Sequence, residues 1–77
     1  MEKFYFHHLR VGDFEVPKDL FNSFVELATH PDSKGNRRFI LHTACDYSEP
    51  NVIYYYLWSR NSDFYYFGYV ERSNYER

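Results

Sequence analysis

The chain has 77 residues, which is enough for one small domain with a limited hydrophobic core. Its net charge of −2 at pH 7 argues against a broadly basic DNA-binding module. No apolar run approaches the ~20 residues that a membrane-spanning helix needs. We expect no secretory signal, because the first ten residues include Glu2, Lys3 and two histidines.

Cysteine usage favours a reducing compartment. Cys45 is the single cysteine, so the chain forms no internal disulfide and no thiolate-rich zinc site. Secreted domains of this size usually carry several disulfides, and a cytoplasmic location is therefore predicted. Because no linker, repeat or low-complexity tract interrupts the sequence, we expect a complete small protein with one domain over residues 1–77.

The first element predicted is a strand over residues 3–10, which is rich in aromatic residues and weakly alternating. Gly12 and Asp13 are typical of a turn. Residues 14–16 then form either a short return strand or the approach to a helix, and the pattern leaves both open.

A helix is predicted over residues 17–29. Pro17 suits the first helical turn, Asp19 favours the positive end of the helix dipole, and Pro31 ends the helix. Its apolar residues follow helical spacing on one stripe, which needs a sheet to pack on: Leu20, Phe21, Phe24, Val25, Leu27 and Ala28.

Three further strands are predicted over residues 37–46, 52–60 and 63–71, with a polar tail over 72–77. Short turns join these strands, so they form an antiparallel meander. The order β-α-β-β-β predicts an α+β fold of two layers, in which one helix packs on one face of an antiparallel sheet of about four strands.

The last two strands place aromatic rings on both faces of the sheet. With Asn61 and Ser62 as a two-residue hairpin loop, Trp58 lies opposite Tyr65, and alternation assigns every side chain to a face. One face carries Tyr54, Tyr56, Trp58, Tyr65, Phe67 and Tyr69. The other face carries Ile53, Tyr55, Leu57, Phe64, Tyr66, Gly68 and Val70, and we expect it to pack on Leu20, Phe24 and Leu27.

No charged residue occurs in 52–59 or 64–70, whereas a half-exposed strand normally alternates apolar with polar residues. One helix covers one face, so the all-aromatic face exceeds the few hundred Å² of apolar patch that an ordinary monomer exposes. Three interpretations remain open: the face binds a partner, it mediates self-association, or it is core beneath the N-terminal segment.

The sequence offers little catalytic chemistry. Cys45 and His42 point to opposite faces of one strand, and we expect Cys45 to be a small buried hydrophobe. His7 and His8 are adjacent and also face opposite ways, without the spacing of a metal site. The paired acids near turns fit solvated surface positions. We therefore predict no catalytic residues, no metal, no cofactor and no enzyme activity.

A nucleic-acid interface is the alternative prediction. Residues 67–70 are similar to the central part of the aromatic motif of RNA-recognition sheets, but Tyr65 and Tyr66 replace its basic residue and glycine, and Arg72 replaces its last aromatic. An aromatic platform with a basic rim of Arg37, Arg38, Arg60 and Arg72 would stack single-stranded bases. The overall negative charge disfavours phosphate binding.

These features favour a non-enzymatic interaction module that inhibits or modulates a protein partner. Small phage-encoded or accessory inhibitors have a similar size and composition. The binding residues predicted are Tyr54, Tyr56, Trp58, Tyr65, Phe67 and Tyr69, since Tyr and Trp bury much area at low entropic cost. A homodimer is the expected oligomer, and no membrane association is predicted.

Overall fold

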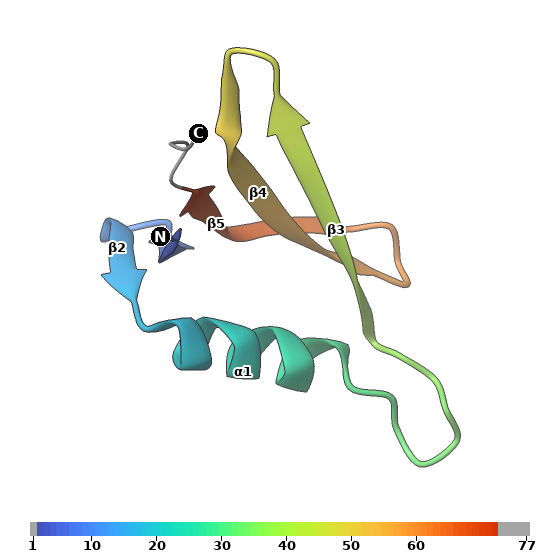
Figure 1. Cartoon of the computed structure of the whole chain (residues 1–77). Helices are drawn as coiled ribbons and strands as arrows, with labels where there is room; N and C mark the ends of the chain where they lie inside the picture. The colour runs from blue at the N-terminus through green and yellow to red at the C-terminus, as the bar shows by residue number, and fades with distance from the viewer. Residues whose placement is uncertain (1, 73–77) are drawn as a thin grey trace.

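The structure of the chain is a computed structural model that describes residues 2–72, and it confirms an α+β fold of two layers (Figure 1). One antiparallel sheet has the strand order β2-β1-β5-β4-β3, and one helix lies across one of its faces. The elements are β1 (Glu2–His8), β2 (Gly12–Val16), α1 (Lys18–Thr29), β3 (Phe39–Asp46), β4 (Glu49–Ser59) and β5 (Phe64–Arg72). Of the predicted tail over 72–77, Arg72 belongs to β5, and residues 73–77 lie outside the described residues.

The sheet has five strands instead of about four, because the segment before the helix is a return strand. β1 ends at His8 and not at residue 10, since the backbone turns there. The His8 ring accepts the backbone N–H of Arg10, and Gly12 adopts a φ of 90°, which glycine allows without strain. β2 then pairs with β1 along its whole length and forms one edge of the sheet.

Helix α1 starts one residue later than predicted, because Pro17 is its extended N-cap residue. At the other end, His30 returns to an extended conformation, and Pro31 forms an isolated bridge with Arg37. The intervening loop is held by Asp32, whose carboxylate accepts two backbone N–H groups. This loop delays β3, which begins at residue 39 and not at 37.

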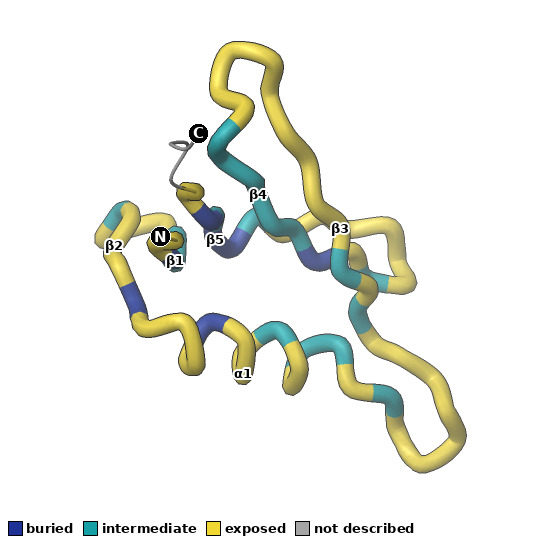
Figure 2. The backbone as a smooth tube through the Cα atoms, viewed as in Figure 1, coloured by how far each residue is buried: buried dark blue, intermediate teal, exposed yellow. Residues whose placement is uncertain are grey.

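The core is centred on Phe21, whose exposed fraction is 1%. Its ring centroid lies 5.3 Å from that of Phe4, 5.5 Å from that of Phe6, 5.1 Å from that of Tyr55 and 5.7 Å from that of Phe67. Figure 2 shows that the buried positions of the helix and the sheet face one another. The buried core consists of Phe4, Val16, Phe21, Leu57, Phe67 and Val70.

The helix packs through a narrower stripe than predicted. Phe21 and Val25 face the sheet, and Phe24 lies beside Phe67, with ring centroids 5.0 Å apart. Leu20 and Leu27 were expected in the core but are mostly exposed, Leu27 by 78%. Each leucine directly precedes a residue that packs on the sheet, Phe21 or Ala28. Successive helix residues are rotated by about 100°, so the two leucines point away from the sheet.

The hairpin between β4 and β5 has a different register from the one predicted. Next to the turn, Trp58 lies opposite Phe64 and not Tyr65. The loop has three residues, and its last residue, Ser62, takes a left-handed φ of 71°. A bulge at Phe67 then inserts one extra residue in β5, so the pairs from residues 53 to 55 keep their predicted partners.

Candidate functional site

The face of the sheet that turns away from α1 is covered by no other element of residues 2–72 (Figure 1). We call it the open face. Strand alternation and ring contacts place aromatic and imidazole side chains from four of the five strands on it. These side chains are Tyr5, His7, His42, Tyr54, Tyr56, Trp58, Phe64, Tyr66 and Tyr69.

The rings of the open face form one continuous strip. It starts at Tyr5 and Tyr69, which stack with ring centroids 4.6 Å apart and planes inclined by 15°. It ends at Trp58 and Phe64, whose centroids are 5.2 Å apart. Tilted and edge-to-face contacts join the two ends through Tyr54, Tyr66 and Tyr56, at centroid separations of 6.1, 5.9, 5.4 and 5.6 Å. Such offset geometries are the ones that aromatic quadrupoles favour.

The strip is half-buried although no element of residues 2–72 lies over it. The tyrosine rings shield one another's edges, while Trp58 and Phe64 stay 43% and 55% exposed. Cross-strand aromatic pairs stabilise a sheet by about 0.2–1 kcal/mol each, so part of this strip contributes to stability. The outward faces of the rings remain accessible, and their lateral packing restricts their rotamers in advance of any binding.

Acidic side chains border the strip. Asp13 and Glu15 lie on edge strand β2, and Glu71 lies near the end of β5. Asp13 contacts the Nδ1 atom of His7 at 2.6 Å, and Glu49 accepts a hydrogen bond of 2.6 Å from the Tyr54 hydroxyl. We call Asp13, Glu15, Glu49 and Glu71 the acidic border.

These carboxylates and local burial disfavour ionised tyrosine. The hydrogen bond to Glu49, with burial and the Glu49 charge, raises the pKa of Tyr54 to about 12. Burial, followed by the charge of Asp13, raises the pKa of Tyr66 to about 12. Burial and the same Asp13 charge also raise the pKa of Tyr69. The Glu49 hydrogen bond is the largest cause of the raised pKa for Tyr54 and burial is the largest cause for Tyr66 and Tyr69, and the nearby carboxylate charges add to both.

A titration of tyrosine absorbance should detect these raised pKa values. We expect Tyr54 and Tyr66 to ionise near pH 12 and not at the usual 10.0. Because their folded-state pKa is raised, the stability they contribute is complete below pH 10.0, falls above it, and is lost as the pH passes about 12. The Glu49→Gln variant is the control, and it should lower the pKa of Tyr54 more than that of Tyr66. Ionisation of Tyr54 and Tyr66 near pH 10 would contradict the raised pKa values.

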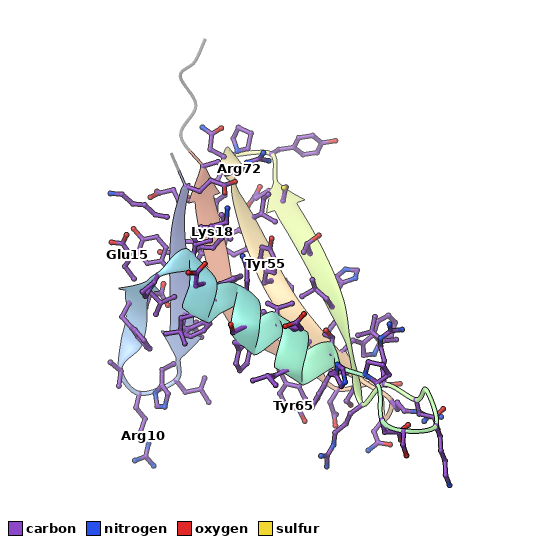
Figure 3. All side chains as sticks on the ribbon, turned by 60° about the horizontal axis from the view of Figure 1, so that its bottom comes forward. Arg10, Glu15, Lys18, Tyr55, Tyr65 and Arg72 are labelled. Atoms are coloured by element: carbon purple, nitrogen blue, oxygen red, sulfur yellow. The ribbon has the colours of Figure 1, made fainter. Side chains whose placement is uncertain are left out.

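Four of the six predicted binding residues lie on the open face, namely Tyr54, Tyr56, Trp58 and Tyr69. The other two lie on the side of the helix. Phe67 is buried against Phe21 and Phe24, and Tyr65 contacts Phe39. Figure 3 views this helix-bearing side and labels Tyr65. Because the bulge separates Phe67 from Tyr69, the four-residue similarity to the RNA-recognition motif does not place both rings on one face.

The sequence prediction also missed members of the strip. Phe64 and Tyr66 take the places assigned to Tyr65 and Phe67, as the altered register requires. β1 adds Tyr5 and His7, since it is an interior strand that lies between β2 and β5. The alternation of Phe4 and Phe6 with Tyr5 and His7 could have predicted this. The more hydrophobic phenylalanines pack on the helix, so the residues between them point to the open face.

The arginines predicted as a rim do not surround the strip. Arg72 lies on the helix side, like Val70, and forms an ion pair of 3.4 Å with Glu2. The other three predicted rim residues are Arg37, Arg38 and Arg60. They line an open hollow of about 580 Å³ beside the C-terminal end of α1, together with Leu27, Ala28 and Phe39. The basic and aromatic surfaces are thus separate.

Cys45 is exposed, which corrects the expectation that it is buried. It lies opposite Ile53 on the helix side of β3, near the tip of the β3–β4 hairpin. This hairpin extends past the reach of the helix (Figure 1), so α1 does not cover the thiol. His42 occupies the other face of β3, as the alternation predicted, and the two side chains form no pair.

Residues 2–72 contain no group of three or more His, Cys, Asp or Glu side chains placed to hold a metal ion. Nor does this part of the chain include a helix with the length and apolar character that crossing a membrane requires. No family model, curated protein or solved structure matches the chain.

Proposed function

We propose that the chain is a non-enzymatic module that docks on a protein partner through the open face and thereby inhibits or modulates that partner. The observation that carries the proposal is the strip of mutually packed rings, over which no element of the described residues lies. Binding would bury ring faces whose rotamers are already restricted, so little side-chain entropy is lost. Tyrosine and tryptophan in such a setting are typical of interface hot spots.

A protein partner is favoured over nucleic acid by the placement of charge. Single-stranded binders pair stacking rings with cations that follow the phosphates. Here Asp13 and Glu15 border the rings, while Arg38 and Arg60 line the separate hollow beside α1. Phosphate groups lying along this strip would meet carboxylates.

Truncation of single rings on the open face should weaken partner binding without unfolding the chain. Tyr56→Ala and Trp58→Ala should each weaken capture of the partner about thirtyfold or more, the usual effect of losing a hot spot. The measurement is affinity capture by the tagged chain, followed by titration with the protein retained. Circular dichroism should report an unchanged fold for both variants.

Leu27→Ala is the matched control, because Leu27 is exposed on the helix side and should leave capture unchanged. Equal capture by Trp58→Ala and the wild type would contradict the proposal. So would loss of the folded signal in both open-face variants, since those rings would then be core residues.

The predicted homodimer is tested by size-exclusion chromatography with light scattering. Trp58 is the single tryptophan, so quenching of its fluorescence reports access to the open face directly. A monomer, or a dimer in which Trp58 remains accessible, leaves the face free for a partner. A dimer that shields Trp58 completely would assign the strip to self-association and overturn the proposed function.

A further inference from the structure

The open face differs in charge from the opposite side of the molecule. Of the two lysine or arginine residues that lie within strands, alternation places Lys3 on this face and Arg72 on the helix side, and Lys3 lies opposite Glu71 in the ladder between β1 and β5. The acidic border adds Asp13, Glu15 and Glu49 around the strip. A surface that docks here therefore gains from positive charge.

Two of these carboxylates are available to an incoming cation. Asp13 is engaged with His7, and Glu49 is engaged with Tyr54. Glu15 and Glu71 have no hydrogen bond or ion pair to any other described residue. They lie at the margin of the strip, where a cationic side chain of a partner can pair with their carboxylates.

Glu15 also lies beside a stacking surface. In the sheet it is paired with Tyr5, and Tyr5 stacks on Tyr69. A planar guanidinium can lie on such a ring and donate two hydrogen bonds to a nearby carboxylate at the same time. A lysine ammonium lacks this planar, two-donor geometry, and it is more strongly hydrated.

We propose that the partner segment which docks on the open face presents arginine side chains that stack on its tyrosine rings and pair with Glu15 and Glu71. This inference rests on the proposed function and names the chemistry of the partner. Cation–π contact and charge pairing act on the same group here, so the aromatic strip and its border form one recognition surface.

A second copy of the chain also carries arginines, in the hollow lined by Arg37, Arg38 and Arg60. Docking of that hollow on the open face would be heterologous and would build open chains of protomers, because the two surfaces differ. Arg37 is already bonded to the Thr29 carbonyl oxygen at 3.1 Å. We therefore assign the open face to a separate protein with arginines of its own.

A defined peptide tests the inference. The probe alternates arginine with glycine, and its matched control replaces each arginine with citrulline, which keeps the shape but removes the charge. Trp58 fluorescence and the NMR shifts of the tyrosine rings report binding at low salt and at about 0.15 M salt. We expect the arginine peptide to bind and to weaken with salt, and the citrulline peptide to bind at least about tenfold more weakly.

Charge-neutral variants locate the site. The double variant Glu15→Gln, Glu71→Gln should weaken the arginine peptide by about tenfold. The double variant Asp19→Asn, Glu26→Gln removes the same charge from α1, on the other side of the sheet, and should bind like the wild type. Lysine in place of arginine should weaken binding as well, since stacking and two-donor pairing are lost together.

The outcomes separate the inference from the proposed function. Equal binding of the arginine and citrulline peptides, or no effect of the Glu15 and Glu71 changes, overturns the arginine preference. The proposed function survives that result if Trp58→Ala still abolishes capture of the partner. Tighter binding of a single-stranded oligonucleotide than of the arginine peptide overturns both, and so does chain-like self-association that Arg38→Glu removes.

Discussion

Replacing Phe21 with alanine is expected to unfold a large share of the molecules at room temperature. Phe21 is 1% exposed, and its ring contacts two rings of β1 and one ring each from β4 and β5. Truncation of a buried phenylalanine costs about 3–5 kcal/mol. A domain this small has a total free energy of unfolding of only about 5 kcal/mol, so the variant keeps little or none.

Urea unfolding followed by circular dichroism and Trp58 fluorescence measures this loss. Phe21→Leu keeps most of the volume and should cost clearly less than the alanine variant. Leu27→Ala removes a leucine from the exposed flank of the same helix and should change the free energy of unfolding by no more than about 0.5 kcal/mol. Similar losses for Phe21→Ala and Leu27→Ala would mean that the helix is not anchored on the sheet through Phe21.

Periodicity in the sequence was sufficient to predict the layers of this fold. The helical spacing of Phe21, Val25 and Ala28 requires an apolar sheet, and the aromatic runs after residue 37 supply three antiparallel strands of it. The same reasoning predicted that one side of the sheet lacks a helix. The fifth strand was left open because residues 14–16 are too few to show a clear alternation.

The faces of β5 were harder to predict, because register depends on single residues. The sequence contains no glycine in the β4–β5 loop, so a two-residue loop and a three-residue loop could not be distinguished. Ser62 adopts the left-handed conformation that three-residue loops need, and this shifts the next side chains to opposite faces. The bulge at Phe67 then restores the predicted alternation for Tyr69 and Val70.

The positions of Arg37 and Arg38 depend on how the loop before β3 packs on the helix, and the hydrophobic pattern of the sequence does not predict that packing. Arg37 and Arg38 precede β3 in a loop that folds against the C-terminal end of α1, where Arg37 bonds to a helix carbonyl. The sequence placed them at the start of a strand and therefore near the sheet rim. They lie beside the end of the helix, in the hollow that Arg60 also lines, and not around the rings of the open face.

Replacing Gly68 with alanine is expected to separate β1 from the rest of the sheet. A Cβ atom at this position would overlap the backbone carbonyl oxygen of Tyr5 and lie 3.3 Å from the Phe21 ring. The carbonyl belongs to the β1 ladder and cannot rotate away as a side chain would, so the two strands must move apart. The cost should be at least about 3 kcal/mol, at the upper end for over-packing, which corresponds to a fall in Tm of about 12–24 °C.

The effect of Gly68→Ala should extend to the open face, because Gly68 precedes Tyr69, which stacks on Tyr5. Hydrogen exchange of the β1 amides should accelerate, and the ring NMR shifts of Tyr5 and Tyr69 should lose the signature of stacking. Gly35→Ala is the control, since Gly35 has open space around it but a φ of 84°. It should cost only about 1 kcal/mol, from backbone strain alone. Equal costs at the two glycines would show that the close approach of β1 to β5 is not what requires glycine at position 68.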